Sequence, residues 1–465
     1  MTQAASTPLP ETGAPDQLAE ASRSGRGMTR TILALAWPVI ALGVMRSGYY
    51  LAGAFFAARL GDDAPAALSA IGGSSFALWI LMCLSDLASV GTLTGVARAA
   101  GAQHTTAARV TLTQGLWVGG LVSVALAVFA RPLAAAYFHA IGYEAPAFAS
   151  ALQFGTRFLE ISLLTAGTLM LHTVTDAAFR GLGDTRTPMV VSAIALLLNV
   201  VLDGVLMLGL GPFPKLGLEG AAWAAALTHG LAFVVSLRVL QKRGVGPSRF
   251  GPSLRSTLEI LRIGAPQALS GVGFCVTYVF LGDSITRFGP SAMAALGIGH
   301  RIEGPSYQVC LGFAVAAAAL VGQNLGRGSR VQAIEAANRA ALLAVLTMVP
   351  FTVAYLVLPR ALVGVLATDA LTVDRGTAYI LAIGSVTVLM ALEVVYESAF
   401  AGAGDTTPAM LVLLPLTAIR VPLAAFIAKN TDWGIGAIFW AIAASTAVKG
   451  LVIWGVFRWR SPRWQ

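Results

Sequence analysis

Long apolar segments separate the few charged residues of this chain, and they limit what it can fold into. We count about twelve such segments, each near the ~20 residues that a helix needs to cross ~30 Å of hydrocarbon. Of the 465 residues, 56% are hydrophobic and 11% are charged, whereas an average soluble domain carries roughly a quarter charged residues. The sequence therefore predicts an all-α polytopic membrane protein and argues against an ordinary soluble enzyme.

The apolar segments form two groups of six on either side of a basic stretch. We predict a disordered cytoplasmic tail over 1–27, an N-lobe over 28–241, a basic cytoplasmic linker over 242–255, a C-lobe over 256–458 and a cytoplasmic tail over 459–465. The predicted spans lie near 31–58, 67–98, 108–130, 148–178, 187–210, 219–240, 256–283, 292–323, 332–358, 372–401, 407–428 and 434–457.

Lysine and arginine are unevenly distributed between the loops that connect these spans. They are concentrated in the linker and in the loops that lie on the same side of the membrane as the N-terminus. Because cytoplasmic loops carry an excess of these residues, we expect both termini in the cytoplasm and the protein in a bacterial-type inner (plasma) membrane. The net charge of +9 reflects this bias. No dense basic segment interleaved with aromatic residues indicates nucleic-acid binding.

The two halves repeat each other. Pro38 and Pro266 are 228 residues apart, as are the segments ARLGDDAPAALSAIG and TRFGPSAMAALGIG. Asp184 in RGLGDTRTPM and Asp405 in AGAGDTTPAM are 221 apart. Six spans return the chain to its starting side, so the lobes have the same orientation and a pseudo-two-fold axis along the membrane normal. Two such bundles with a site between them are typical of a transporter.

Several segments resemble those of one transporter family. RGLGDTRTPM, PKLGLEGAAWA, ALGIGHRIEG and LVGQNLGRG are similar to segments of multidrug and toxic compound extrusion (MATE) transporters, most closely the DinF-like bacterial branch. The resemblance covers roughly residues 28–458. It implies a V-shaped, twelve-helix antiporter that expels amphipathic, mainly cationic organic compounds in exchange for protons or sodium ions. Where DinF-like members commonly carry an acid in the first helix, this chain has Gly53, so the protein either lacks the family's proton site or relies on other acids.

Polar residues within the N-lobe spans are candidates for ion coupling, because a charge at the bilayer centre costs at least ~2.5–3.5 kcal/mol. Asn199 and Asp203 lie one turn apart on one helix face, where they can share a proton or offer oxygens to Na⁺. The family's N-lobe cation site has this Asn-x-x-x-Asp pattern. Alternatively, Asp203 is solvated near the outer end. Asp86 is either a proton carrier or the partner of Arg46.

The eighth span carries a second group of charges. Arg301 and Glu303 are two residues apart and point to different helix faces. Pro305 removes a backbone donor and loosens the helix, so freed carbonyls near Glu303 could coordinate a cation or polarise a proton site. Alternatively, these residues form a structural clamp between the lobes.

The tenth and eleventh spans carry further charges. Glu393 and Glu397 lie four residues apart on one face, where like charges disfavour double ionisation, and Glu393 is the deeper candidate for ion coupling. Asp176 is the equivalent of Glu397 and is expected to pair or cap at the cytoplasmic end. Arg420, the equivalent of Asn199, is expected to hold a carboxylate such as Glu393 or to attract an anionic substrate.

A further set of residues could line the substrate cavity or control access to it. Pro38 and Pro266 should kink their helices, either as static bends or as bends that change with protonation. Aromatic residues nearby could bind organic cations through cation–π contacts. The proposed cavity and gating residues are Arg46, Pro38, Pro266, Tyr50, Tyr278, Arg301 and Arg420. Asp184 and Asp405 are expected to cap the helices that follow them.

Two other functions compete with export. A lipid-linked oligosaccharide flippase of the same superfamily would need a basic cavity for its pyrophosphate, and an intramembrane enzyme would need a catalytic motif. The sequence contains no HExxH, GxSxG or Walker A pattern. Three isolated cysteines suggest neither a disulfide framework nor a zinc site. We therefore predict a monomeric transporter without a cofactor, whose partners are an organic substrate, H⁺ or Na⁺ and the lipid bilayer.

Overall fold

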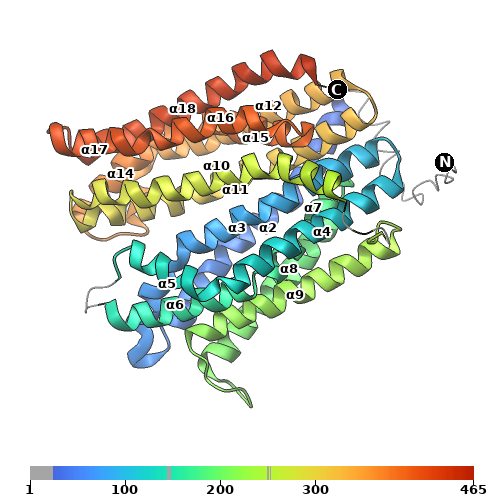
Figure 1. Cartoon of the computed structure of the whole chain (residues 1–465). Helices are drawn as coiled ribbons and strands as arrows, with labels where there is room; N and C mark the ends of the chain where they lie inside the picture. Colours follow the sequence, from blue (N-terminus) through green and yellow to red (C-terminus); the bar gives the residue numbers. More distant parts are fainter. Residues whose placement is uncertain (1–24, 144–147, 249–250, 252, 465) are drawn as a thin grey trace. The chain divides into compact units, whose positions relative to one another are not determined.

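The structure is a computed structural model that describes residues 25–143, 148–248, 251 and 253–464. Most of the predicted N-terminal tail lies outside the described residues, and so do the side chains of residues 25–26 and 49–51, which include Tyr50. All regular secondary structure in the described ranges is helical, which confirms the predicted all-α class (Figure 1).

Ten helices in the described ranges are long and apolar enough to cross a membrane, and two bent helix pairs bring the number to twelve if each pair is one span. This agrees with the twelve predicted segments. The ten are α2 (Gly25–Ala57), α3 (Ala64–Gly101), α4 (Thr105–Val128), α8 (Arg186–Leu208), α9 (Leu218–Lys242), α10 (Leu254–Thr286), α11 (Pro290–Gly326), α12 (Arg330–Val357), α16 with α17 (Thr406–Ala418 and Arg420–Asn430) and α18 (Gly434–Arg460).

The bent pairs are a feature that the apolar pattern did not predict. Helices α6 (Ala149–Leu164) and α7 (Ala166–Gly181) meet at 50°, and α14 (Ala370–Gly384) and α15 (Thr387–Ala403) meet at 56°. Neither break contains proline. The residues before α7 and α15, Thr165 and Val386, are 221 positions apart, so the break belongs to the internal repeat. Two short helices before these pairs, α5 (Ala130–Ala140) and α13 (Pro359–Gly364), were also not predicted.

Contacts between residues divide the chain into two compact units. The first unit is Val44–Ala268, and the second comprises residues 25–43 and 269–464 of the described chain. The division falls inside α2 and α10, shortly after Pro38 and Pro266, although both helices run through their prolines without interruption. The predicted lobes divide the chain by the position of the repeat in the sequence, whereas these units divide it by contacts between residues. The lobe boundaries therefore stay a prediction.

The two units are built in the same way, each around one long central helix. In the first unit α3 packs against α4, α6 and α7, and α9 packs against α6, α7 and α8. In the second unit α11 packs against α12, α14 and α15, and α18 packs against α14, α15 and α16–α17. The repeat seen in the sequence is therefore also a repeat of helix packing.

Small residues let these central helices approach closely. A Cβ atom added at Gly181 of α7 would lie 2.8 Å from the carbonyl oxygen of Leu93 in α3. At the equivalent Gly402 of α15 it would lie 2.2 Å from the carbonyl oxygen of Ala318 in α11. Without side chains at these positions the backbones touch, which is the usual way helices associate in membranes. Each central helix is thereby fixed against the bent pair of its own unit.

Candidate ion and substrate sites

The polar face of α8 supplies the first candidate site. Asn199 and Asp203 are both buried, and Asp203 is 1% exposed. The Nδ2 group of Asn199 donates a hydrogen bond to Thr228 Oγ1 of α9 at 3.0 Å. The Oδ1 atom of Asn199 and both carboxylate oxygens of Asp203 have no hydrogen-bond partner among the described residues. These three unpartnered oxygens form a polar site on the buried face of α8. Because Asp203 is buried, the alternative that it is solvated near the outer end does not fit this structure.

A second polar group lies two turns away, toward the start of α8. Ser192 Oγ lies 3.3 Å from His172 Nε2 and 3.4 Å from Asp176 Oδ2, both of α7. His172 Nε2 is 3.7 Å from the same Asp176 oxygen. The ring of His229 in α9 lies 5.9 Å from that of His172, measured between centroids. Sequence analysis missed both histidines, although each is the single histidine of its predicted span.

Asp86 of α3 has different partners from those predicted. It is half-buried and accepts a hydrogen bond from Ser89 Oγ at 3.0 Å. Its electrostatic partner is Arg180 of α7, and no ion pair with Arg46 occurs among the described residues. The charge of Arg46 interacts electrostatically with Arg180 and with His229. Of the two alternatives for Asp86, the pair with Arg46 is thus not formed in this structure, and the role of proton carrier stays a prediction.

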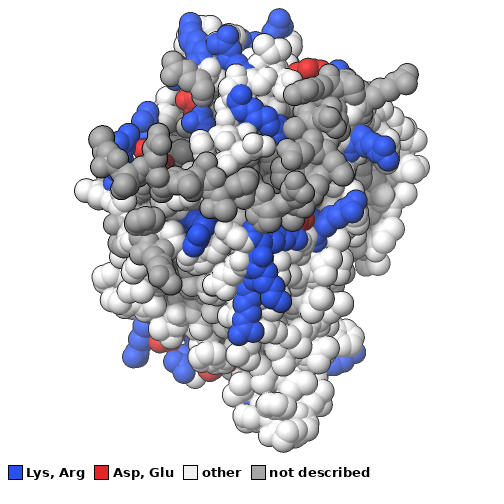
Figure 2. All heavy atoms as spheres, turned by 90° about the vertical axis from the view of Figure 1, so that its right-hand side faces the viewer, with Lys and Arg blue, Asp and Glu red and all other residues white. Residues whose placement is uncertain are grey.

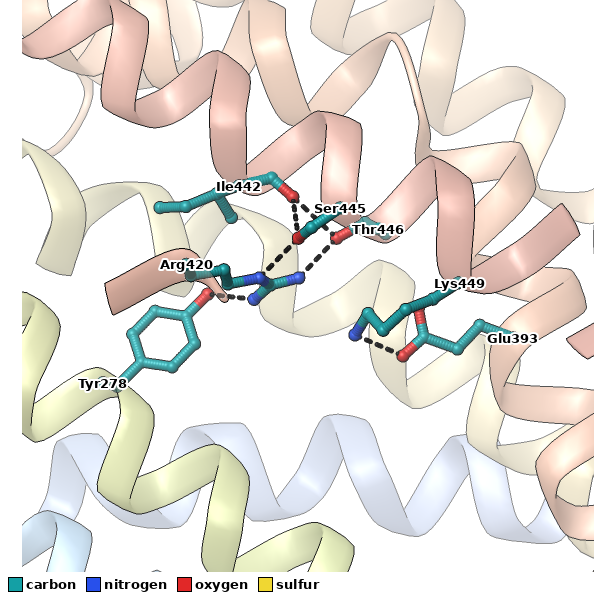
Figure 3. Close-up of polar contacts among 7 residues, drawn as sticks. All are labelled: Tyr278, Glu393, Arg420, Ile442, Ser445, Thr446 and Lys449. Carbon is teal, nitrogen blue, oxygen red and sulfur yellow. Dashed lines mark hydrogen bonds and ion pairs between the residues drawn. The ribbon is translucent and has the colours of Figure 1, made fainter. Parts of the chain in front are cut away.

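The second unit places Arg420 at the start of α17, in the position equivalent to Asn199. Its side chain is 3% exposed and donates to three hydroxyl groups (Figure 3): Ser445 at 2.6 Å, Thr446 at 2.9 Å and Tyr278 at 3.2 Å. The predicted pair with Glu393 is not formed. Arg420 is thus a buried cation that is held by neutral groups.

Glu393 of α15 pairs with a residue that sequence analysis overlooked. Lys449 Nζ of α18 donates to Glu393 Oε1 at 2.6 Å (Figure 3), and the two side chains are 4% and 13% exposed. Lys449 is a single charge within STAVKGLVIW, and that isolation was the available signal. Glu393 therefore has a resident cationic partner, which its spacing from Glu397 did not reveal.

Glu303 lies in the same unit and is linked to aromatic residues. Its Oε2 atom accepts a hydrogen bond from Tyr379 OH at 2.9 Å. The His300 ring lies between Tyr379 and Tyr278, with centroids 5.7 Å and 5.0 Å away. These ring contacts connect Tyr379, the hydrogen-bond partner of Glu303, to Tyr278, a hydrogen-bond partner of Arg420. Arg301, which neighbours Glu303 in sequence, is exposed.

The predicted gating residues have varied environments. Pro38 and Pro266 are buried within unbroken helices, and Tyr278 is buried beside Arg420. Tyr50 lies outside the described side chains. The predicted capping role of Asp184 is confirmed, because its Oδ1 accepts from the backbone N–H groups of Arg186 and Thr187, both at 2.9 Å. Asp405 makes no such cap and binds Arg460 at 2.9 Å.

These groups can bind small ions or charged parts of a substrate, and they do not resemble a catalytic centre. Within the described residues, no group of three or more His, Cys, Asp or Glu side chains is arranged to hold a metal ion. The first unit has oxygen atoms that lack partners, and the second has cations and carboxylates that are already partnered. The two copies of the repeat therefore present different chemistry.

Known proteins share both the sequence and the fold. The chain is 26% identical over 411 residues to the probable multidrug resistance protein NorM of Thermotoga maritima, covering 87% of each. It is 25% identical over 416 residues to the FAD transporter of Shewanella oneidensis, covering 85% of this chain and 87% of the relative.

A solved structure of a multidrug resistance MATE family transporter of the MOP superfamily, in its outward-facing conformation, superposes with a TM-score of 0.86. It is 20% identical and covers 96% of this chain and 98% of its own. That likeness shows a shared fold. The sequence matches the MatE family over residues 38–205 and 266–426, and the chain therefore belongs to the MatE family of membrane transporters, which are not enzymes.

Proposed function

We propose that this protein is a secondary exporter that expels amphipathic organic compounds, mainly cations, in exchange for H⁺ or Na⁺ by alternating access. The observation that carries the proposal is the buried carboxylate of Asp203, whose two oxygens have no hydrogen-bond partner among the described residues. The names of relatives, which include probable multidrug resistance proteins, support the class of substrate.

An unpartnered carboxylate in an apolar interior is strongly unfavourable when it is ionised. A proton on Asp203 removes the charge, and a sodium ion compensates it. Sodium is a hard cation that favours oxygen ligands, and Asn199 Oδ1 offers a third oxygen beside the carboxylate. A transporter state that exposes Asp203 to water would release the ion, and a state that buries it would need the ion. This difference between states is the physical basis for coupling.

The proposal can be tested by ethidium efflux from proteoliposomes that carry an imposed proton or sodium gradient. Asp203→Asn keeps the size of the side chain and removes its charge, so we expect gradient-driven efflux to fall by at least about tenfold, equal to about 1.4 kcal/mol of lost coupling. The exposed Asp62→Asn is the control and should transport normally. Efflux that is unchanged by Asp203→Asn and by collapse of both gradients would contradict the antiporter proposal.

A second candidate function is export of anionic organic compounds. It is favoured by Arg420, a buried guanidinium whose hydrogen-bond partners are all neutral hydroxyls, and by the relative named FAD transporter. The sequence-based alternative, a lipid-linked oligosaccharide flippase, would also need a buried cation such as Arg420, in its case to bind the pyrophosphate of the lipid. Competition of ethidium efflux by FAD separates the two candidates, and Arg420→Gln should abolish that competition if the cargo is anionic.

We further propose that the protein lies in the inner membrane with both termini in the cytoplasm. Met28, in the first turn of α2, and Trp464 both contribute to one hydrophobic cluster of the second unit, which supports a position of the two ends on one side. The face in Figure 2 carries many Lys and Arg side chains and few Asp and Glu. Such an excess is typical of the cytoplasmic side. A monomeric state stays a prediction.

A further inference from the structure

The polar group of His172, Asp176 and Ser192 in the first unit is separate from the Asp203 site. Ser192 lies seven residues before Asn199 on α8, a separation of about 10 Å along the helix axis. Both groups occupy the buried face of α8. The group therefore extends a polar line through the interior of the unit, between α7, α8 and α9.

Two atoms of this group are unsatisfied in a way that packing does not explain. His172 Nδ1 and Asp176 Oδ1 are buried and have no hydrogen-bond partner among the described residues. A buried polar atom without a partner costs about 1–3 kcal/mol, so such atoms call for a functional reason. The opposite atoms, His172 Nε2 and Asp176 Oδ2, both lie within reach of Ser192 Oγ. The three side chains thus form a chain with an open atom at each end.

We propose that His172, Ser192 and Asp176 form a proton relay in the first unit, with the His229 ring beside His172. This inference rests on the proposed function and describes a route for its proton. His229 Nδ1 lies 2.8 Å from the carbonyl oxygen of Ala225. In the tautomer that donates to this carbonyl, His229 Nε2 carries no proton, so His229 can pass a proton to His172 only after it has itself taken one up at Nε2.

The transfer is balanced atom by atom. A proton binds His172 Nδ1, and the Nε2–H bond breaks as its proton passes to Ser192 Oγ. The Ser192 O–H bond breaks at the same time, and that proton forms a new O–H bond at Asp176 Oδ2. His172 ends neutral with its proton on Nδ1, and Asp176 ends as a carboxylic acid. The two distances, 3.3 and 3.4 Å, are long for hydrogen bonds and would shorten during transfer.

The charges around the relay limit how many protons it holds. Arg180 of α7 interacts electrostatically with Asp176. It also interacts electrostatically with Asp86 of α3 and Arg46 of α2. Arg46 and His172 also act on His229. The two guanidinium groups disfavour a positive charge on both imidazoles together, and Arg180 favours the Asp176 carboxylate. The relay therefore carries one proton at a time, and Arg180 opposes lasting protonation of Asp176, so Asp176 holds the proton only transiently.

The test uses the full chain in proteoliposomes with a pH-sensitive dye inside and ethidium as the transported compound. Ser192→Ala should lower substrate-driven proton movement by about 100-fold, the low end of what positioned proton transfer contributes. Ser192→Thr keeps the hydroxyl and should restore it. Ser236→Ala removes a hydroxyl from another buried serine of the same unit, one that has no hydrogen-bond partner in the described part of the chain, and should leave proton movement unchanged.

A second readout does not depend on transport. In protein labelled with ¹⁵N-histidine, the His172 resonance is assigned by its loss in His172→Gln, and its titration should shift in Asp176→Asn. The relay would be overturned if proton-coupled transport were normal in Ser192→Ala, or if the His172 titration did not change in Asp176→Asn. Either result would leave the proposed function standing. Wild-type ethidium transport without proton movement would overturn the relay and restrict the proposed function to sodium.

Discussion

Individual buried charges are handled differently in the two units. Asp203 in the first unit has no partner for its carboxylate among the described residues, whereas Glu393 in the second is bound by Lys449 at 2.6 Å. Arg420, which stands in the place of Asn199, fills its position with a fixed cation. Single residues thus give duplicated bundles different chemistry, although their helices pack alike.

The Lys449–Glu393 pair gives a stability prediction. Lys449→Met leaves a buried carboxylate without its cation, so it should lower the free energy of unfolding by about 3–5 kcal/mol. The double variant Lys449→Met/Glu393→Gln removes both charges and should recover most of that loss. Denaturant unfolding in detergent measures both, with the exposed Lys429→Met as the control. A double variant that is as unstable as the single one would show that the pair does not act as a unit.

The residues of the first site could be predicted from sequence, because Asn199 and Asp203 lie one helical turn apart in the same span. The partners of the second site could not. Glu393 and Lys449 come from α15 and α18, and Tyr379 reaches Glu303 from α14. No local pattern links residues that are 56 or 76 positions apart. For Asp86, the alternative of a pair with Arg46 rested on depth alone, and depth does not reveal the charge of Arg180 on α7, which also interacts with Asp86.

Whole helices were easier to predict than the breaks inside them. Apolar length alone located every span, because a bilayer demands about 20 residues whatever their order. The breaks before α7 and α15 carry no proline, so the pattern gave no warning of them. Beside the second break, Gly384 packs closely against α12, where a Cβ would lie 2.6 Å from Tyr355 Cβ. Contacts of that kind cannot be read from hydropathy.

The turn between α7 and α8 should respond to pH. Burial by itself would raise the pKa of Asp184, but hydrogen bonds from Thr187 and Arg243, with the charge of Arg243, outweigh it and lower the pKa. The resulting stability is complete above the ordinary pKa of 3.8 and is lost as the pH falls through the lower pKa of the folded protein. Asp184→Asn removes the ion pair with Arg243 and should therefore cost up to about 1 kcal/mol near neutral pH.

The difference between Asp184→Asn and the wild-type protein should shrink once the pH drops below 3.8. Thermal unfolding in detergent over a pH series measures it, with Asp62→Asn as the matched surface control. A difference that stays constant down to the lowest pH would mean that the charge of Asp184 does not contribute.

Close approach of α15 and α11 gives a prediction for the central helices. Gly402→Ala places a methyl group 2.2 Å from a backbone oxygen, so the helices must separate, and the free energy of unfolding should fall by about 1–3 kcal/mol. Gly455→Ala in α18 meets nothing within 4 Å and should be neutral or slightly stabilising. Equal effects of the two substitutions in thermal unfolding would refute the packing argument.

The topology of the whole molecule can be checked by labelling. The three native cysteines, Cys83, Cys275 and Cys310, are buried. In a variant that lacks them, an impermeant maleimide added to intact cells should label Asp62→Cys and should not label Lys242→Cys, because an odd number of spans separates the two positions. Lysed cells should label both. Labelling of Lys242→Cys in intact cells would reverse the proposed orientation.

The cation beside Glu393 differs from a dissolved ion in one respect: it cannot diffuse away. Lys449 is attached to the backbone of α18, so its local concentration is fixed by the fold and does not follow the salt content of either compartment. A carboxylate neutralised in this way is insensitive to ionic gradients. In the exchange proposed above, the first unit, whose buried oxygens lack partners among the described residues, would therefore respond to the ion gradient, while the second would not.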